Sequence, residues 1–244
     1  TRGVTERTDM FGDVVIPLYE DDARDIAKYI LQQDVEGVAV CFLHSYANAQ
    51  NEQRMETILK EAMAELGIDL PIYLSSHIRP VIRENQRVNA TTIEAYAADP
   101  VRQQLHNVEA SATQRGFRKQ MTTMLSYGGL ANIRHPRLHE TLISGPIGGL
   151  LGAHYVSRII GADNVLAVDM GGTSYDFGLI TNGTLNLNNE PEIARFRLAL
   201  PSLELDSIRG GAGLYVSVDP ITNRIVMGPE GAGANPGPVC FDKG

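Results

Sequence analysis

Residues 165–181 read VLAVDMGGTSYDFGLIT, and this stretch decides how the second half of the chain folds. Two four-residue apolar runs, VLAV and FGLI, stand on either side of a turn-forming segment, residues 169–176. Short apolar runs joined by a glycine-containing turn are typical of consecutive β-strands. We therefore predict a strand–turn–strand here, not the strand–helix of most phosphate loops. Asn182-Gly183, the strongest hairpin dipeptide, follows directly.

The turn carries the residue types that a phosphate-binding site needs. Two adjacent glycines let backbone N–H groups point into one concavity and let a phosphate approach without interference from a Cβ atom. The neighbouring threonine and serine add hydroxyl donors. The candidate phosphate contacts are Gly171, Gly172, Thr173 and Ser174.

Two aspartates flank these contacts. Asp169 ends the first strand, where its carboxylate can reach Mg²⁺ or the water shell of the ion, so it is the candidate metal ligand. Asp176 could orient a water molecule or stabilise the turn, and both aspartates are catalytic candidates. An ordinary Gly-Gly hairpin with aspartates as turn formers has the same pattern, and that alternative stays open.

The first third of the chain alternates strands and helices, which predicts a layered α/β fold with right-handed crossovers. We expect strands at residues 13–18, 37–43 and 71–75, and helices at residues 21–33 and 51–66. Residues 37–43 read GVAVCFL, an uninterrupted apolar run typical of a strand buried on both faces. We expect Cys41, inside this run, to be an inert core thiol.

Two helical regions follow. We expect the first, residues 80–115, to break at Pro100, because proline cannot donate the helical hydrogen bond. The second, residues 145–160, has a face almost free of side chains, for which we favour tight helix packing. That face consists of Gly148, Gly149, Gly152 and Ala153.

Composition excludes several classes of protein. The 244 residues carry 21 Lys+Arg against 29 Asp+Glu, a net charge of −8 that argues against a nucleic-acid partner. No apolar run approaches the ~20 residues that span a bilayer, so we expect no membrane partner. Two cysteines fit a reducing compartment, and we expect a cytoplasmic protein. The 24 glycines, about a tenth of the chain, gather mostly in the second half.

The order of these motifs resembles the hydantoinase/oxoprolinase family, that is, its HyuA-type subunits. The resemblance rests on MLSYGGL, SGPIGGLLGA, DMGGTSYD and PEGAGANPGPVCF, and on the upstream segments GVAVCFLHSYANAQNE and YLSSHIRPVIRENQR. It covers nearly the whole chain. The family includes N-methylhydantoinases, 5-oxoprolinases and ATP-dependent acetone and acetophenone carboxylases.

The resemblance implies a partial actin-like (ribonuclease H-like) ATPase fold of class α/β, with two subdomains joined by a hinge helix and ATP between them. Residues 1–144 would belong to the first ATPase domain, residues 145–160 would form the interdomain helix, and residues 161–244 would start the second domain. The family's phosphate loops come as a pair, and residues 169–176 match the second. The first, a similar Asp-x-Gly-Gly-Thr turn, is absent from these 244 residues, so we expect an internal part of a longer subunit.

Departures from the family pattern bear on the branch. Where hydantoinases commonly carry D-V-H-T-I-G-A-G-G-G-S, this chain reads ELDSIRGGAGL, residues 204–214. Asp206 replaces the usual histidine, Arg209 and Ala212 replace glycines, and Leu214 replaces a serine. Tyr127 replaces an asparagine. These changes favour the acetone-carboxylase-like branch. The glycines of this segment, Gly210, Gly211 and Gly213, are weaker candidates for nucleotide or substrate contacts.

The leading hypothesis is thus a fragment of an ATP-dependent ketone carboxylase subunit, which uses Mg²⁺ and ATP to phosphorylate bicarbonate and the enolised ketone. The resemblance also implies a HyuB-type partner subunit, with Mn²⁺ held there. The alternatives are an ATP-dependent cyclic-amide hydrolase and a subunit-docking fragment that binds no nucleotide. Among the other polar residues, His135 and His139 are spaced for a shared helix face but lack a third metal ligand. Cys240 lies in a loop whose environment the sequence does not reveal.

Overall fold

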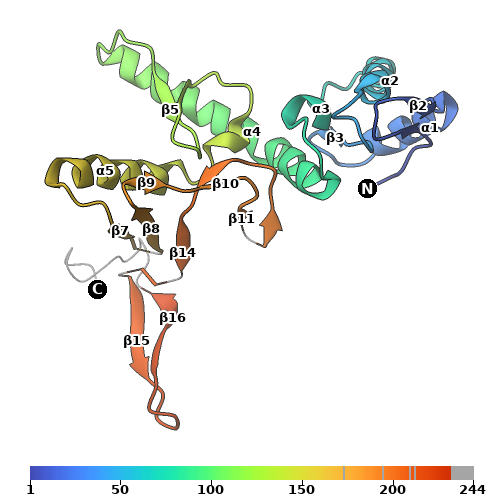
Figure 1. Ribbon diagram of the computed structural model, residues 1–244. Coiled ribbons are helices and arrows are strands. Elements are labelled where there is room, and N and C mark those ends of the chain that lie inside the picture. Colours follow the sequence, from blue (N-terminus) through green and yellow to red (C-terminus); the bar gives the residue numbers. More distant parts are fainter. Residues whose placement is uncertain (173, 194, 209, 212, 232–244) are drawn as a thin grey trace. The chain divides into compact units, whose positions relative to one another are not determined.

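The computed structural model describes residues 1–231 except 173, 194, 209 and 212 (Figure 1). The predictions for Thr173, Arg209, Ala212 and Cys240 therefore lie outside the described residues. The chain forms two compact units. The first contains Thr1–Leu125, Leu130–Leu142 and Asn189–Pro201, and the second contains Ser126–Gly129, Ile143–Asn188 and Ser202–Gly244.

The first unit is a layered α/β structure, as the sequence predicts. Strands β3 (Val38–Val40) and β4 (Ile72–Leu74) pair in parallel, with Ala39 opposite Tyr73. Helices α1 (Glu20–Leu31) and α2 (Gln50–Leu66) pack against each other and against one face of these strands. Helix α2 ends at Gly67, which adopts a left-handed conformation (φ 67°), the usual helix-ending role of glycine. A short hairpin, β1 (Arg7–Thr8) and β2 (Val14–Ile16), precedes α1.

Two predictions for this unit are wrong. Helix α4 runs without a break over Glu84–Gln114 and includes Pro100. Its packing explains why, because Ala98 and Val101, on either side of the proline, both pack into a cluster with Leu138. The β3 run is also not buried on both faces, since Val38 and Val40 are buried but Ala39 between them is exposed.

The remaining elements of the first unit are short. Helix α3 (Ser75–Ile78) starts directly at the end of β4. The others are β5 (Thr122–Met124), β6 (Leu130–Asn132), the 3₁₀ helix η1 (Leu138–Thr141), β11 (Glu192–Ile193) and β12 (Phe196–Arg197).

A buried polar network joins the ends of β3 and β4 to α2 and α4. The Glu52 carboxylate, fully buried, accepts hydrogen bonds from the Phe42 amide (2.9 Å), the Ser75 hydroxyl (2.6 Å) and the Ser76 amide (2.9 Å). The buried Arg87 guanidinium donates to the Ser75 hydroxyl (3.1 Å) and the Phe42 carbonyl (2.7 Å). Ser75 therefore connects a buried anion to a buried cation, so that neither charge is left unpaired.

The second unit consists of one helix and an antiparallel sheet. Helix α5 (Ser144–Ile160) packs on β7 (Val165–Met170) and β8 (Tyr175–Thr181), and the sheet order is β14-β8-β7 with β9 (Thr184–Leu185) also on β8. Strand β14 spans Asp206–Ile208. The predicted strand–turn–strand is confirmed. Asn182 and Gly183 have positive φ angles (51° and 67°), as the predicted hairpin turn requires.

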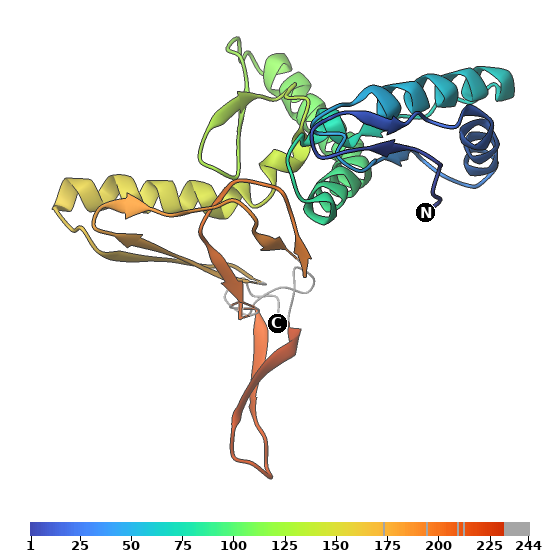
Figure 2. The ribbon, with the colours of Figure 1, turned by 45° about the vertical axis from the view of Figure 1, so that its right-hand side comes forward.

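Two further strand pairs complete this unit. Strand β10 (Leu187–Asn188) pairs with β13 (Ser202–Leu203). Strands β15 (Leu214–Val218) and β16 (Ile225–Gly231) form a twisted antiparallel ribbon, drawn in orange and red in Figure 2. Among the described residues, no helix is both long and apolar enough to cross a lipid bilayer.

Candidate functional site

The turn between β7 and β8 brings the two predicted aspartates directly opposite each other. In the antiparallel register Asp169 pairs with Asp176, and Ala167 pairs with Gly178 two positions along. Side chains of opposed residues point to the same face of a sheet. Asp169 is exposed and Asp176 is half-buried. Two carboxylates thus share one face, next to the glycine turn.

Helix α5 covers that same face. A Cβ atom added to Gly178 would lie 2.7 Å from Cδ1 of Leu150, so a larger residue here would force the Leu150 side chain to shift. A cavity of about 210 Å³ lies between α5 and the two strands. Apart from the two carboxylates at one end, its lining side chains are apolar or absent. It is lined by Pro146, Gly149, Leu150, Ala153, Ala167, Val168, Asp169, Asp176, Phe177, Gly178 and Leu205.

The turn itself uses some of its polar groups internally. The Gly171 amide donates to the Ser174 carbonyl (2.9 Å), which closes the turn. The Ser174 hydroxyl donates to Oδ2 of Asp176 (3.2 Å) and so orients that carboxylate. A Cβ added at Gly172 would meet nothing within 4 Å, so there is open space on this side of the residue. A Cβ added at Gly171 would lie 3.8 Å from the Ser174 carbonyl oxygen, so of the two turn glycines Gly172 has more room for a ligand.

The structure joins the two predicted glycine clusters. The Gly213 amide donates to the Gly172 carbonyl (3.2 Å), and a Cβ on Gly213 would lie 2.9 Å from that oxygen. Gly210, Gly211 and Gly213 are all buried. Strand β14, just before this cluster, places Ser207 opposite Asp176. Gly213 of this second cluster therefore supports the turn through a backbone hydrogen bond.

The prediction of tight packing for the small-residue face of α5 is wrong at two positions. A Cβ added to Gly149 or Gly152 would meet nothing within 4 Å. The close approach comes instead from Gly178 on the sheet, a position that no motif in the sequence marks. The cavity-lining residues of α5 follow a helical spacing (146, 149, 150, 153), and this spacing was the signal that could have found them.

The carboxylate pair has the chemistry of a Mg²⁺ site that a ligand completes. Mg²⁺ prefers oxygen ligands and is usually held by one or two carboxylates together with phosphate oxygens. Within the described part of the chain, no group of three or more His, Cys, Asp or Glu residues could hold a metal ion by itself. Asp169 and Asp176 could supply the two carboxylates of such a site, because they share one face of the sheet and the nearby Gly172 has open space on its Cβ side.

The paired histidines of the first unit have structural partners. Nδ1 of His139 lies 2.6 Å from Glu94, and Nε2 of His135 lies 3.0 Å from Glu140. Glu94 is buried and also accepts the backbone amides of Leu138 and His139. Burial alone would raise the pKa of Glu94, but the hydrogen bonds from His139 and the two amides outweigh it and lower this pKa. His139 therefore fixes η1 to α4, whereas His135 pairs with Glu140 within η1.

Comparison with known proteins decides the family. Residues 87–244 match the pattern described as Hydantoinase/oxoprolinase, and residues 1–63 match the Hydantoinase/oxoprolinase N-terminal region. The chain belongs to the hydantoinase/oxoprolinase family. The sequence resemblance is thus confirmed.

Relatives in this family include both carboxylases and amide hydrolases. The chain is 42% identical to the acetone carboxylase beta subunit of Xanthobacter autotrophicus, over 99% of this chain and 34% of that protein. It is 30% identical to the acetophenone carboxylase gamma subunit of Aromatoleum aromaticum, over 99% of this chain and 33% of that subunit. It is also 30% identical to caprolactamase subunit alpha of Pseudomonas jessenii, over 96% of this chain and 33% of that subunit. The chain spans about a third of the length of these relatives.

Solved structures of the family have the same fold. Nucleotide-free acetone carboxylase, studied for the mechanism of ATP-dependent acetone carboxylation, matches with a TM-score of 0.85 at 42% identity over 95% of this chain and 33% of that chain. The ATP-dependent caprolactamase of Pseudomonas jessenii matches with a TM-score of 0.79 at 29% identity, over 99% of this chain and 35% of that chain. The mixed α/β architecture of the chain is therefore that of ATP-dependent members of this family.

Proposed function

We propose that this chain is part of a subunit of an ATP-dependent ketone carboxylase that binds Mg-ATP and supports phosphorylation of bicarbonate and an enolate. The observation that carries the proposal is the opposition of Asp169 and Asp176 beside the open Gly172, at the end of the cavity under α5. The 42% identity to the acetone carboxylase beta subunit favours a ketone as the substrate.

Each residue of the turn has a role in this proposal. Asp169 and Asp176 would hold Mg²⁺, which neutralises charge that develops on the transferred phosphoryl group. Gly172 gives the phosphates access to the backbone, and the Ser174 hydroxyl keeps Asp176 oriented. Positioning and charge stabilisation are the main tasks of a protein in phosphoryl transfer. This small set of groups therefore supports that chemistry.

The proposal extends to the rest of the protein. In an actin-like arrangement, ATP would lie between two domains, with the Asp169–Asp176 turn contributing the second phosphate loop. A HyuB-type partner subunit would complete the carboxylase, with Mn²⁺ held in that partner. Subunit names among the relatives, such as acetone carboxylase beta and caprolactamase alpha, support a multi-subunit enzyme. We propose that it acts in the cytoplasm.

An amide hydrolase is the second candidate. It is favoured by the 0.79 TM-score to ATP-dependent caprolactamase, because the same fold there serves an amide substrate. Against it stands Asp206, which occupies a position where hydantoinases commonly carry histidine. Both candidates use the same phosphate chemistry and differ in the electrophile.

Substrate profiling of the intact complex separates the two candidates. With ATP present, we expect turnover of acetone or acetophenone that requires bicarbonate, and no turnover of hydantoin, 5-oxoproline or caprolactam. Turnover of a cyclic amide without bicarbonate would replace the carboxylase with the hydrolase.

A matched pair of aspartate variants tests the site. In the intact enzyme Asp169→Asn and Asp176→Asn should each lower ATP turnover by roughly 100-fold or more, the scale seen when a transition-state charge partner is removed. Asp163→Asn, an exposed aspartate of the same unit, should leave turnover unchanged. Equal turnover in all three variants would remove the turn from the nucleotide site.

Calorimetry with Mg-ATP tests the third possibility, a docking fragment. The 244 residues lack the first Asp-x-Gly-Gly-Thr loop, so we expect weak or undetectable binding by this chain alone. Binding by the intact enzyme but not by the chain supports the two-loop site. Failure of both to bind would make the chain a docking element, and sub-micromolar binding by the chain alone would refute the need for a second loop.

A further inference from the structure

A histidine with a strained backbone follows the first strand of the parallel pair in the first unit. His44 comes shortly after Val40, the last residue of β3, and its φ angle of 54° lies in the left-handed region. Arg83, just before α4, is also left-handed (φ 79°), and Glu84, the first residue of α4, faces His44. Side chains at the carboxyl ends of parallel strands line binding sites in α/β sheets, and strained residues gather at such sites. This end of the sheet is therefore a candidate site.

The two ring nitrogens of His44 have different surroundings. Nδ1 is buried and lies 3.6 Å from Oε1 of Glu84, and within the described residues it has no hydrogen-bond partner. The His44 amide donates to the same oxygen (3.5 Å). The side chain is 22% exposed, so the part that reaches solvent is the outer side of the ring, with Nε2. A carboxylate beside Nδ1 favours the tautomer with the proton on that nitrogen, which leaves a lone pair on Nε2.

Glu84 provides a fixed negative charge beside this ring. Burial alone would raise the pKa of Glu84, but hydrogen bonds from its own amide and from the His44 amide, together with the charge of Arg87, outweigh burial and lower this pKa. Arg87 Nη1 lies 3.6 Å from the Glu84 carboxylate. A second carboxyl group within electrostatic range of His44 belongs to Glu6, before β1. Burial raises the pKa of Glu6, and the charge of His44 is a small effect in the opposite direction.

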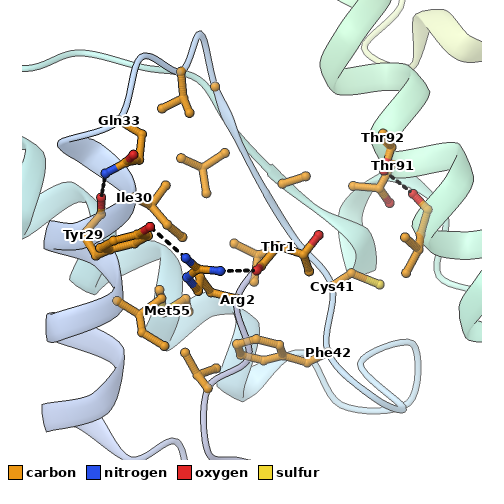
Figure 3. A pocket seen from close by; sticks show the side chains of 18 residues that line it. Thr1, Arg2, Tyr29, Ile30, Gln33, Cys41, Phe42, Met55, Thr91 and Thr92 are labelled. Atoms are coloured by element: carbon orange, nitrogen blue, oxygen red, sulfur yellow. Dashed lines mark hydrogen bonds between the residues drawn. The ribbon is translucent and has the colours of Figure 1, made fainter.

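Buried groups hold the segment around His44 in place. Phe42 lies just after β3, where it also lines a cavity of about 500 Å³ beside the strand (Figure 3). Its amide donates to Glu52 (2.9 Å) and its carbonyl accepts from Arg87 (2.7 Å), so both backbone groups are fixed close to His44. The Tyr46 ring packs edge-on against the His44 ring, with centroids 5.9 Å apart, and the Arg87 guanidinium lies over Tyr46. Rigid support of this kind is what a residue in proton transfer requires.

We propose that Nε2 of His44 accepts the proton from the O–H group of a small oxygen nucleophile, and that Glu84 is the positioning residue of this histidine. The identity of the nucleophile as bicarbonate rests on the proposed function. The bicarbonate O–H bond breaks and its proton goes to Nε2, while the same oxygen forms a bond to the γ-phosphorus of ATP. The bond between that phosphorus and the β,γ-bridging oxygen breaks, and ADP leaves with the electron pair. Glu84 balances the charge of the imidazolium, which then gives its proton to water.

A purely structural role in a turn is the competing interpretation. The His44 carbonyl accepts hydrogen bonds from the amides of Ala47 (2.9 Å) and Asn48 (3.3 Å), and histidine is one of the residues that tolerate a positive φ angle. A turn alone does not explain why Nδ1 is buried beside a carboxylate at a distance too long for a hydrogen bond. Contacts between catalytic groups are often this long before a substrate binds.

Two substitutions of His44 suit its backbone conformation and remove the base. Glycine and asparagine both accommodate a φ angle of 54°, so His44→Gly and His44→Asn should keep the Tm of the wild type. In the intact enzyme each should lower turnover by roughly 100-fold or more, the contribution of a general base. His77→Asn changes an exposed histidine of the same unit and should leave turnover unchanged. Full turnover in both His44 variants, or a large fall in their Tm, would assign His44 to the turn alone and overturn the proposal.

Added imidazole gives a readout that a structural role would not change. The missing ring leaves a space in His44→Gly, so we expect imidazole to raise turnover of this variant by roughly 10-fold, less than full recovery because a free base is not held in position. The rescue should grow with pH as neutral imidazole replaces imidazolium. The cation 1,3-dimethylimidazolium has no lone pair and should restore nothing. Absence of rescue by imidazole, or equal rescue by both compounds, overturns the proposal.

Glu84→Gln tests the positioning role. This change keeps the shape of the side chain but removes the charge beside Nδ1, and it should lower kcat by roughly 10–100-fold with little change in KM, as loss of an orienting partner does. Imidazole should not restore this variant, since the His44 ring still occupies its place. A wild-type kcat in Glu84→Gln would overturn the assignment of Glu84.

Failure of this inference is distinguishable from failure of the proposed function. All variants are measured with the substrate that the wild-type enzyme turns over. If the wild type hydrolyses a cyclic amide without bicarbonate, the proposed carboxylase is wrong, and the same His44 variants then test water as the O–H nucleophile. If the wild type requires bicarbonate and the His44 variants keep their turnover, only this inference fails.

Discussion

The Gly213 amide donates to the Gly172 carbonyl across 3.2 Å, so the loop after β14 is attached to the turn between β7 and β8 through the backbone. A Cβ on Gly213 would lie 2.9 Å from that carbonyl oxygen, and a Cβ on Gly231 would collide with the carbonyl of Gly213. Three glycines distant in sequence thus lie close together, and the backbone excludes a side chain at Gly213 and Gly231 but not at Gly172. The glycine content of the second half serves this close approach as well as the open space at Gly172.

Gly213→Ala should therefore displace the turn. The added methyl group meets a backbone oxygen that cannot rotate away, and we expect a loss of about 1–3 kcal/mol in the free energy of unfolding. Gly172→Ala is the matched control, since its Cβ meets nothing within 4 Å. Urea denaturation measures the free energy of unfolding of both variants. If Gly172→Ala leaves stability unchanged but weakens nucleotide binding by the intact enzyme, Gly172 contacts the ligand.

Gly178→Ala should destabilise the second unit, because its Cβ would lie 2.7 Å from Cδ1 of the buried Leu150. We expect a cost of about 1–3 kcal/mol. Gly152→Ala makes the same chemical change on α5 with nothing nearby, and should stabilise the helix by roughly 0.5–1 kcal/mol.

A double mutant identifies the cause of the first effect. In a Leu150→Val background the cost of Gly178→Ala should shrink, since the shorter side chain leaves space for the methyl group. An unchanged cost in that background would rule out the contact with Leu150 as the source.

Ser75→Ala should cost about 2 kcal/mol of unfolding free energy, because it removes the hydroxyl that connects Glu52 to Arg87 and leaves two buried charges underpaired. Ser76→Ala is a control in the adjacent position, since within the described residues its buried hydroxyl has no hydrogen-bond partner. In thermal and urea denaturation, Ser75→Ala should be clearly less stable than Ser76→Ala. Similar losses in both would mean that the network adds nothing beyond ordinary packing.

Glu94→Gln should lower stability at pH 7 by roughly 2 kcal/mol, the value of a hydrogen bond to a charged group. The pKa of Glu94 is lowered in the folded protein. Its stabilising effect is therefore complete above the ordinary value of 4.5 and is lost as the pH falls below it, through the folded pKa. The difference between wild type and Glu94→Gln should accordingly narrow in urea titrations carried out below pH 4.5.

Glu109→Gln provides the comparison. Glu109 pairs with the exposed Arg134 (2.7 Å), and pairs of this kind contribute about 0–1 kcal/mol. If Glu109→Gln loses as much unfolding free energy at pH 7 as Glu94→Gln, the buried Glu94 carboxylate contributes no more to stability than an exposed ion pair.

The sequence predicts helices and strands well where neighbouring residues alone determine the local structure. The apolar runs around residues 169–176 fixed β7 and β8, and Gly67 ended α2 as expected. Asp169 and Asp176 were candidates from their chemistry, but their direct opposition depends on the register of the hairpin. The predicted helix break at Pro100 is wrong because packing of residues on both sides of the proline keeps α4 continuous. Such long-range contacts cannot be predicted from the residues next to the proline.

The lining of the cavity was harder to predict for the same reason. Leu150 and Gly178 touch only because a helix crosses a strand 28 positions later in the sequence, and neither residue type suggests a site by itself. The exposed Ala39 is a different case. There the apolar pattern of residues 37–43 is typical of a strand buried on both faces, but the structure leaves Ala39 exposed.

The facing carboxylates of Asp169 and Asp176 have a thermodynamic consequence. Like charges directly opposite each other on a ladder repel, so the register of β7 and β8 holds Asp169 and Asp176 together against their mutual repulsion. A divalent cation that binds there gains its own coordination energy and also relieves this repulsion. If Mg²⁺ binds there as proposed, cation binding and hairpin stability would be coupled, and each should strengthen the other most at low ionic strength.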